Sequence, residues 1–381
     1  MTQRTPQPGF SSAEYQAMAA ALDAALLGPR GANPLVGAAV VNAHGQILHV
    51  GHHRGAGTPH AEVDAITQAR AAGTDLREAT MVVTLEPCDH RGRTGPCSHA
   101  ILEAGIQRVI YAAADSTAAA GGAETLRQAG VHVARGLMEA QAVDLNHRWF
   151  RAQEQRRPFV TVKTAQSLDA RIAAADGTSQ WITGEAARAH AHAVRGRVDA
   201  ILVGTQTVFT DDPRLTVRGA SGTVGERDLG TGLPHPGPLR VAMGHRTVPA
   251  TAKIRGTDGR FRHLATHDPF TALEQLYDDG VRHLLVEGGA TVVGAFLAAD
   301  LTDDLWVYQA PVILGAGRGS IPDLGVQTLR EALRFRPDAS EGAAVQHLGD
   351  DLVWHLEPDR PLPSATTAQP YLNSDQGKEN S

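Results

Sequence analysis

The sequence predicts an α/β protein of two domains, and three observations support this fold class. The chain has 381 residues, more than a single hydrophobic core usually organises. In both halves, apolar runs with strand character alternate with helical patterns, which is typical of layered domains with mainly parallel sheets. Between the halves, residues 151–158 read RAQEQRRP, the composition of an interdomain connection. We therefore expect domains over residues 1–150 and 158–358.

The first half is predicted to begin with a helix and a hairpin. Apolar residues from Met18 to Leu26 recur at helical spacing behind Ser11 or Ser12, either of which can cap the helix. The runs LVGAAVV and QILHVGH flank the turn sequence NAHG. Alternation then predicts a helix over 61–72, a strand at TMVVTL, a helix over 97–104, a strand at RVIYAAA, a helix at AETLRQAG, a strand at VHVARG and a helix at EAQAVDLNHRWF.

The second half repeats this alternation. It predicts a strand at FVTVKTAQSLD, a helix over 186–195, strands at DAILVG, LRVAMG and HLLVEGG, a helix over 290–299 and a strand at DDLWVYQAPVIL. Glycine and proline in residues 218–238 predict a mobile loop. Residues 359–381 are too polar to form a core, which predicts a disordered tail.

Composition narrows the classes of partner. A formal net charge of -6 argues against an extended nucleic-acid surface, although a few local arginines can still hold a small anionic substrate. No apolar run approaches the roughly 18 residues that a membrane span needs. The amino-terminal sequence lacks the apolar segment of a secretory signal, so we expect a cytoplasmic protein without nucleic-acid or membrane partners.

Four residues point to metal-dependent chemistry. His60 and Glu62 open a predicted helix in TPHAEVDAI, and both cysteines of the chain, Cys88 and Cys97, follow in LEPCDHRGRTGPCSHAI. A catalytic zinc ion needs three protein ligands and an open position for water, and His60 with the two cysteines supplies that number. Glu62 matches the glutamate that moves protons in zinc deaminases without binding the metal.

Two less specific interpretations compete with a catalytic zinc site. A core histidine beside two inert, buried cysteines is a common arrangement, and a structural zinc site would normally add a fourth protein ligand. A disulfide is not needed as a staple in a reducing cytoplasm. The order H-A-E, then E-P-C after a strand, then a second cysteine opening a helix favours catalysis.

The spacing of the cysteines, together with NPLVG and HRGAGTPHAE, resembles the deaminase half of the bifunctional deaminase–reductase family of riboflavin biosynthesis. Eight residues separate the cysteines, whereas two do so in most deaminases acting on cytidine, tRNA or single-stranded DNA. The resemblance implies a cytidine-deaminase-like three-layer domain in which Asn33, His53, His90 and Arg93 hold the pyrimidine and its ribose phosphate. The sequence departs from the family's usual residues at Leu35, Asp89 and Gly95.

The second half lacks the G-x-G-x-x-G fingerprint of dinucleotide binding. HLLVEGGATVVGAFL does place two glycines between a strand and a helix, where a phosphate could approach free N–H groups, although such a pair is more often a simple turn. The second half also carries the motifs of the family's reductase half in the same order: VKTAQSLDARIA, SQWITG and VGTQTVFTDDPRLTVR, followed by this glycine turn. That reductase half resembles dihydrofolate reductase in fold and uses NADPH. The resemblance covers about residues 12–357.

This resemblance implies site residues in the second half. NADPH would be held by Ala165, Trp181, Thr207, Asp211, Gly244, Gly289, Ala290, Thr291, Val292, Val293, Gly294 and Ala295. The substrate would be held by Ser179, Arg195, Leu215, Arg218 and Glu287. The sequence departs from the family at Met243 and Gly244, where Asp-Ser is frequent, and at Ala170, where Gly is common.

The resemblance implies two reactions on one small phosphoribosyl pyrimidine. Zinc-dependent hydrolysis would deaminate 2,5-diamino-6-(5-phosphoribosylamino)pyrimidin-4(3H)-one, and NADPH would then reduce the ribosyl group of 5-amino-6-(5-phosphoribosylamino)uracil to ribityl. Lys163 and Asp211 are candidates for steering protons in the reduction. The alternatives are a deaminase whose second half is not catalytic, a nucleic-acid editing deaminase, which the acidic charge disfavours, and a structural zinc module. The sequence leaves open whether the chain forms a homo-oligomer.

Overall fold

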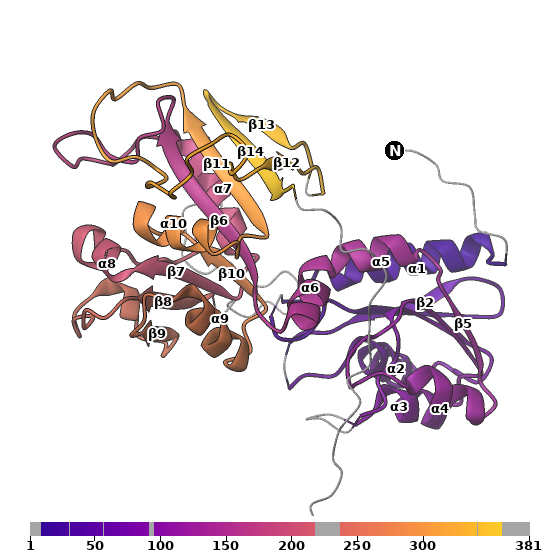
Figure 1. Ribbon diagram of the computed structural model, residues 1–381. Helices are drawn as coiled ribbons and strands as arrows, with labels where there is room; N and C mark the ends of the chain where they lie inside the picture. The colour runs from indigo at the N-terminus through magenta and orange to yellow at the C-terminus, as the bar shows by residue number, and fades with distance from the viewer. Residues whose placement is uncertain are drawn as a thin grey trace, which may run out of the picture.

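The computed structural model describes residues 9–29, 31–55, 57–90, 95–217, 237–340 and 342–359. Two sheets, each with helices on both faces, lie side by side, and helix α6 (His147–Gln155) lies where the two layered units meet (Figure 1). The predicted α/β class is confirmed. None of the helices in the described ranges is long and apolar enough to cross a bilayer.

The first sheet has the strand order β2-β1-β3-β4-β5. Its strands are β1 (Gly37–Val41), β2 (Ile47–His52), β3 (Thr80–Leu85), β4 (Arg108–Ala113) and β5 (His132–Arg135). β3, β4 and β5 are parallel, whereas β1 runs antiparallel to both of its neighbours. Helices α1 (Ser12–Ala25) and α5 (Glu139–Leu145) cover one face, and α2 (Ala61–Ala71), α3 (Cys97–Glu103) and α4 (Gly122–Gln128) cover the other (Figure 1).

Local chemistry fixes these helices against the sheet. The Ser11 side chain accepts a hydrogen bond from the Glu14 N–H, and the Glu14 carboxylate accepts one from the Ser11 N–H, which together form a capping box at the start of α1. A side chain at Gly51 in β2 would collide with the backbone of Ala61 and Ala65. Glycine there lets the first turn of α2 lie directly on the sheet, which sets the positions of His60 and Glu62.

Within the described residues the second sheet has nine strands, eight of them in the order β12-β14-β11-β6-β10-β7-β8-β9, with β13 paired to β14. The run from β11 to β9 is parallel, and β12, β13 and β11 pair antiparallel with β14. The strands are β6 (Phe159–Ser167), β7 (Ala200–Gly204), β8 (Leu239–Met243), β9 (Phe261–Leu264), β10 (His283–Val286), β11 (Asp304–Ala310), β12 (Phe335–Pro337), β13 (Val345–Leu348) and β14 (Asp351–Pro358).

Apolar side chains on both faces of this sheet build the second core. Helices α9 (Pro269–Asp278) and α10 (Ala290–Ala298) pack on one face, while α7 (Glu185–Arg195), α8 (Thr205–Asp211) and the short 3₁₀ helix η1 (Lys253–Arg255) pack on the other. Because parallel strands end at a common edge, the turns after β6, β7 and β10 open on the same side of the sheet.

The structure differs from the sequence prediction mainly at the connection between the halves. The helix predicted to end at residue 150 is two helices, α5 and α6, broken at Asn146, and α6 continues to Gln155 through most of the predicted linker. Helices α8 and α9 and strands β9, β12, β13 and β14 were not predicted. Most of the predicted loop at 218–238 and of the predicted tail at 359–381 lies outside the described residues.

The junction is held by backbone and charge contacts. The Asn146 side chain accepts from the Leu35 N–H and donates to the Leu35 carbonyl, each at 2.8 Å, and so fixes this peptide segment of the first half. Arg157 donates to both carboxylate oxygens of Asp303 at 2.6 and 2.8 Å, with the carboxylate almost fully buried. The chain therefore enters β6 in a fixed direction.

Candidate active sites

Three predicted metal ligands converge at the ends of two helices and a strand. His60 precedes α2, Cys88 follows β3 and Cys97 opens α3. The His60 Nδ1 atom lies 3.2 Å from Cys97 Sγ and 3.5 Å from Cys88 Sγ, and the three ligand atoms all lie within 4.8 Å of one another. Tetrahedral zinc with Zn–S bonds of about 2.3 Å and Zn–N bonds of about 2.0 Å separates S from N by roughly 3.5 Å. The donor set therefore fits zinc.

The electrostatics of the cluster suit a cation. Hydrogen bonds from Cys97 and His60 lower the pKa of Cys88 to about 4, so this residue is a thiolate at neutral pH. In the described part of the chain, no fourth histidine, cysteine or carboxylate joins the three ligand atoms. This arrangement matches a catalytic zinc site, which keeps one position for water, rather than a structural site with four protein ligands.

Glu62 lies beside the ligands with 3% of its surface exposed, and it lines the same cavity as His60 and Cys88. Burial, together with the negative charge of Cys88, raises the pKa of its carboxyl to about 7. A carboxyl with this pKa can both accept and return a proton near neutral pH.

The cavity measures about 470 Å³ and includes three of the residues predicted to bind substrate: Asn33, His53 and His90. The His53 Nε2 atom accepts from Asn33 Nδ2 at 2.8 Å and its Nδ1–H donates to the Pro59 carbonyl at 3.2 Å, as expected for a neutral imidazole whose pKa is lowered by burial. The Asn33 side chain is thereby oriented with its carbonyl oxygen left as an acceptor. The fourth predicted residue, Arg93, lies outside the described residues.

Two of the departures from the family have local roles. Asp89 accepts hydrogen bonds from the hydroxyls of Ser98, in α3, and Thr125, in α4. Leu35 is buried, and its backbone is the one that Asn146 binds. Both residues thus support the walls of the cavity. Gly95 adjoins a segment that the structure does not describe.

The cavity also contains residues that sequence reasoning missed. Trp149 and Gln153 come from α6, and Glu86, Asp115 and Thr117 follow β3 and β4. Glu86 and Asp115 could have been suspected, because polar residues after parallel strands often reach a site. Nothing in the composition of residues 151–158 signals that Gln153 reaches the cavity.

A second cavity, of about 670 Å³, opens at the carboxyl ends of the parallel strands in the second sheet. The predicted cofactor and substrate residues that line it are Ala165, Ser179, Thr207, Asp211, Glu287, Gly289, Ala290, Thr291 and Val292. Gly289 precedes α10, so the glycine turn does lead into a helix at the cavity. The residues 172–175, Gly177, Gly317, Arg318 and Ser320 also line it and were not predicted.

A buried charge cluster lies beside this cavity. Arg195 donates to both oxygens of Glu287 at 2.8 and 2.5 Å. Burial lowers the pKa of Lys163, which lines the cavity with Glu287. Burial also raises the pKa of Asp211, and Arg318 partly offsets this effect.

The other predicted residues of the second half do not line the described cavity. Trp181 is 69% exposed, with the Arg188 guanidinium 4.7 Å from its ring centre. Leu215 and Val293 belong to the hydrophobic cores. The other predicted residues that do not line this cavity are Arg195, Gly244, Gly294 and Ala295. Arg218 lies outside the described residues.

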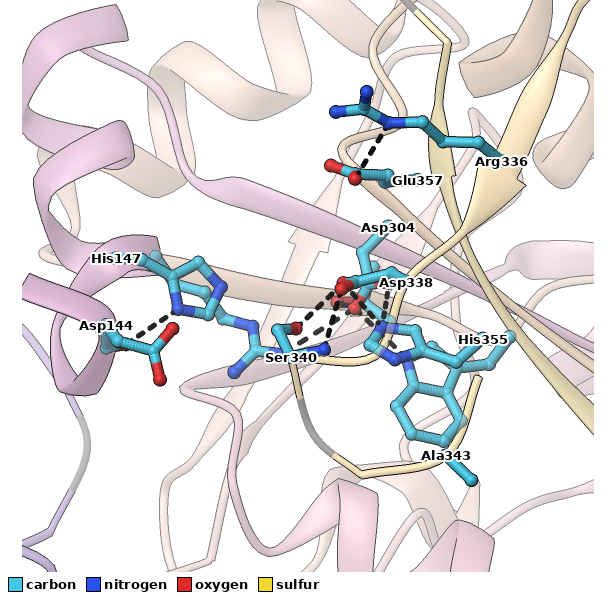
Figure 2. A network of polar contacts seen from close by, with 12 residues as sticks. Asp144, His147, Asp304, Arg336, Asp338, Ser340, Ala343, His355 and Glu357 are labelled. Carbon is cyan, nitrogen blue, oxygen red and sulfur yellow. Dashed lines mark hydrogen bonds and ion pairs between the residues drawn. The ribbon is translucent and has the colours of Figure 1, made fainter. Parts of the chain in front are cut away.

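The described residues contain a second cluster of the ligand types that bind metals, formed by Asp304, Asp338 and His355 (Figure 2). The His355 Nε2 atom lies 2.6 Å from Asp304 Oδ1 and 3.3 Å from Asp338 Oδ2, so it carries the proton that both carboxylates share. Trp306 Nε1 and the Thr161 hydroxyl donate to the other oxygen of Asp304. Protein donors satisfy this cluster, which makes it a structural network rather than a metal site.

Comparisons with known proteins agree with this geometry. Residues 11–113 match the cytidine and deoxycytidylate deaminase zinc-binding region, and residues 158–346 match the RibD C-terminal domain. The riboflavin biosynthesis protein RibD of Mycobacterium tuberculosis is 41% identical over 325 residues, which cover 85% of this chain and 90% of that protein. RibD of Escherichia coli is 36% identical over 355 residues, covering 85% and 93%.

Solved structures match most of the chain, across both halves. A diaminohydroxyphosphoribosylaminopyrimidine deaminase/5-amino-6-(5-phosphoribosylamino)uracil reductase from Thermotoga maritima superposes with a TM-score of 0.78 at 30% identity, covering 91% of this chain and 99% of that one. RibD of Acinetobacter baumannii gives a TM-score of 0.79 at 33% identity, with the same coverage.

Proposed function

This chain belongs to the RibD family of riboflavin biosynthesis proteins, and from that premise we propose how its two cavities carry out the two reactions. The chain is a bifunctional enzyme in which a deaminase is joined to a reductase. A deaminase with a non-catalytic second half is not favoured, because that half matches the RibD C-terminal domain. We assign the deaminase to residues 1–150 and the reductase to residues 158–358, each of which contains one of the sheets.

The deaminase substrate is 2,5-diamino-6-(5-phosphoribosylamino)pyrimidin-4(3H)-one. The observation that carries this assignment is the convergence of His60, Cys88 and Cys97 beside buried Glu62 in one cavity. The three ligands would hold Zn²⁺, which supplies an activated water molecule when bound. Neither cysteine is in a disulfide. Reduced cysteines are the form that binds metal, and a reducing cytoplasm maintains that form.

In the deamination, Glu62 moves the protons. Its carboxylate accepts a proton from the attacking water and delivers it to the ring nitrogen. It then accepts the hydroxyl proton of the tetrahedral adduct and delivers it to the amine, which leaves as ammonia while the ring carbonyl forms. Asn33 and His53 are joined by a hydrogen bond and act as a unit that orients the pyrimidine ring. His90 and Arg93 complete the binding of the substrate.

In the second reaction, 5-amino-6-(5-phosphoribosylamino)uracil is reduced in the larger cavity. NADPH, which supplies the hydride when bound, would lie against Ala165, Thr207 and the turn that starts α10, where backbone N–H groups suit a phosphate. Trp181, Asp211, Gly244 and the remainder of 289–295 complete the proposed cofactor site. Ser179, Arg195, Leu215, Arg218 and Glu287 form the proposed substrate site.

One experiment tests both assignments. The purified chain is given the diaminopyrimidine substrate with and without NADPH, while ammonia release and absorbance at the NADPH band are followed separately. We expect ammonia in both cases and oxidation of NADPH that follows deamination. Ammonia release with no oxidation of NADPH would favour the monofunctional deaminase, and the absence of ammonia would overturn the assignment of the first cavity.

A further inference from the structure

Helix α6 contributes to the deaminase cavity although it lies outside the deaminase family match. Trp149 and Gln153 line the cavity that contains His60 and Glu62. The match to the zinc-binding region ends at residue 113, and the match to the RibD C-terminal domain begins at residue 158. Part of the deaminase cavity is thus built by the segment between the two family domains.

The reductase half holds α6 in place at two points. The Tyr277 hydroxyl, on α9, donates to Gln153 Oε1 at 2.9 Å. One turn and a half earlier, Arg148 Nη2 lies 3.7 Å from Asp304 Oδ2 on β11, and both side chains are buried. Asp304 is itself fixed by His355, which Asp338 also contacts (Figure 2). The position of α6 therefore depends on the reductase fold.

Helix α6 also contacts the segment of the first half that is proposed to bind substrate. Trp149 Nε1 donates to the Ala32 carbonyl at 2.9 Å, directly before Asn33. Trp149 thus covers the edge of the cavity next to the Asn33–His53 pair. The deaminase and reductase halves meet at the rim of the first cavity rather than at a distance from it.

The bond from Tyr277 leaves Gln153 with a defined chemistry. Because Gln153 Oε1 accepts from Tyr277, its Nε2 group remains as a donor, and among the described residues no protein group accepts from it. A cavity of about 470 Å³ is large enough for a whole small ligand rather than for a pyrimidine ring alone. When the reacting carbon lies at Glu62 and the metal ligands, the ribosyl phosphate extends along the rest of the cavity.

We propose that Gln153 and Trp149 bind the ribosyl phosphate portion of the deaminase substrate, with Gln153 donating to its oxygens, and that Tyr277 of the reductase half is a positioning residue for Gln153. This inference rests on the proposed deaminase function. It makes the affinity of the deaminase for its substrate depend on a hydroxyl group of the other half of the enzyme.

Full-length variants test the proposal by the split between KM and kcat for ammonia release. Gln153→Ala removes the donor and is expected to raise KM roughly fivefold to tenfold, the loss of one hydrogen bond, with kcat within twofold of wild type. Tyr277→Phe leaves the glutamine free to turn and is expected to raise KM by a smaller factor. The matched control is Glu154→Gln, on the exposed side of the same helix, with unchanged kinetics.

Gln153→Glu separates substrate binding from helix packing. The glutamate can still accept from Tyr277, so a purely structural role predicts no change. Because its negative charge would face the substrate phosphate, Gln153→Glu is expected to raise KM more than Gln153→Ala does. Added salt should reduce the difference in KM between these two variants. NADPH oxidation with the deaminated substrate reports that each variant is folded.

Two outcomes overturn the proposal while leaving the deaminase assignment intact. One is a KM within twofold of wild type for both Gln153 variants, and the other is a fall in kcat without a change in KM. A wild-type chain that releases no ammonia would instead overturn the proposed deaminase function itself.

Discussion

Arg195 and Glu287 form a two-point ion pair beside the reductase cavity, with Nε–Oε1 and Nη2–Oε2 distances of 2.8 and 2.5 Å. Burial alone would raise the pKa of Glu287, but Arg195 and, to a smaller extent, Lys163 lower it to about 2. The carboxylate is therefore ionised throughout the neutral range. The pair holds the Arg195 guanidinium in a fixed orientation beside the cavity that Glu287 lines.

Replacing Glu287 by Gln should lower stability in a manner that depends on pH. Because the pKa of the folded state, about 2, lies below the ordinary value of 4.5, the ionised carboxylate stabilises the fold above about pH 4.5. This contribution is lost as the pH falls towards 2. At pH 7 the variant should lose about 3 kcal/mol, as when one partner leaves a buried pair.

The check is the difference in Tm between wild type and Glu287→Gln across pH. The difference should be largest near pH 7 and should shrink below pH 4.5. A difference that stays constant down to pH 3 would mean that the ion pair does not stabilise the fold.

Replacing Glu62 by Gln should remove deamination and spare reduction. The amide cannot accept a proton from water, and general acid–base groups typically contribute about 10²- to 10⁴-fold. The rate of ammonia release should fall by at least about 10²-fold, while NADPH oxidation with the deaminated substrate continues. Metal content measured by atomic emission serves as the control, since Glu62 is not among the three clustered ligands. Ammonia release at the wild-type rate would exclude Glu62 as the proton carrier.

Removing the metal should separate the two activities in the same direction. A chelator such as dipicolinate is expected to abolish ammonia release and to leave NADPH oxidation unaffected, because the ligands belong to the first domain alone. Zn²⁺ added back should restore activity. Cys97→Ser should bind less zinc per chain than wild type. Full deamination by metal-free protein would contradict the zinc assignment.

Replacing Ala170 by Gly should stabilise the chain. Ala170 has a φ of +59°, in the left-handed region that favours glycine, at the turn after β6. Glycine relieves this strain, although its greater entropy in the unfolded chain offsets part of the gain. The net effect should be a rise in the free energy of unfolding of about 0.5 to 1 kcal/mol. The matched control is Ala191→Gly within α7, which should lower it by about 1 kcal/mol. Denaturant unfolding measures both, and a destabilised Ala170→Gly chain would contradict the strain.

Sequence reasoning predicted the fold class and the metal cluster because both depend on strong local signals. The strand–helix alternation repeats in each half, and His60, Cys88 and Cys97 each stand at the start of a helix or the end of a strand. Parallel strands bring such positions to one edge. The order of motifs then predicted the ligand atoms that lie within 4.8 Å of one another.

Sequence reasoning failed where a role depends on distant contacts. Gln153 lies in a polar segment that looks like a linker, and its role follows from a bond to Tyr277, 124 residues away. Strand β14 joins the second sheet through pairing with β11, and its mixed polar pattern gave no sign of this. Gly244 has a φ of +134°, and a side chain there would meet Thr205. The glycine that appeared as a departure from the family is thus required by the local backbone.

The break at Asn146 has a practical consequence for dissecting the enzyme. Asn146 itself binds the Leu35 backbone, and Arg148 in α6 reaches Asp304, so residues 146–158 contact both halves at once. Dividing the chain where the composition changes would remove part of the cavity wall from one fragment. It would remove the contacts with α6 from the other. Two overlapping fragments that both carry this stretch would each keep only the contacts made within that fragment, including Asn146 with Leu35 in the first, and Arg148 with Asp304 and Arg157 with Asp303 in the second.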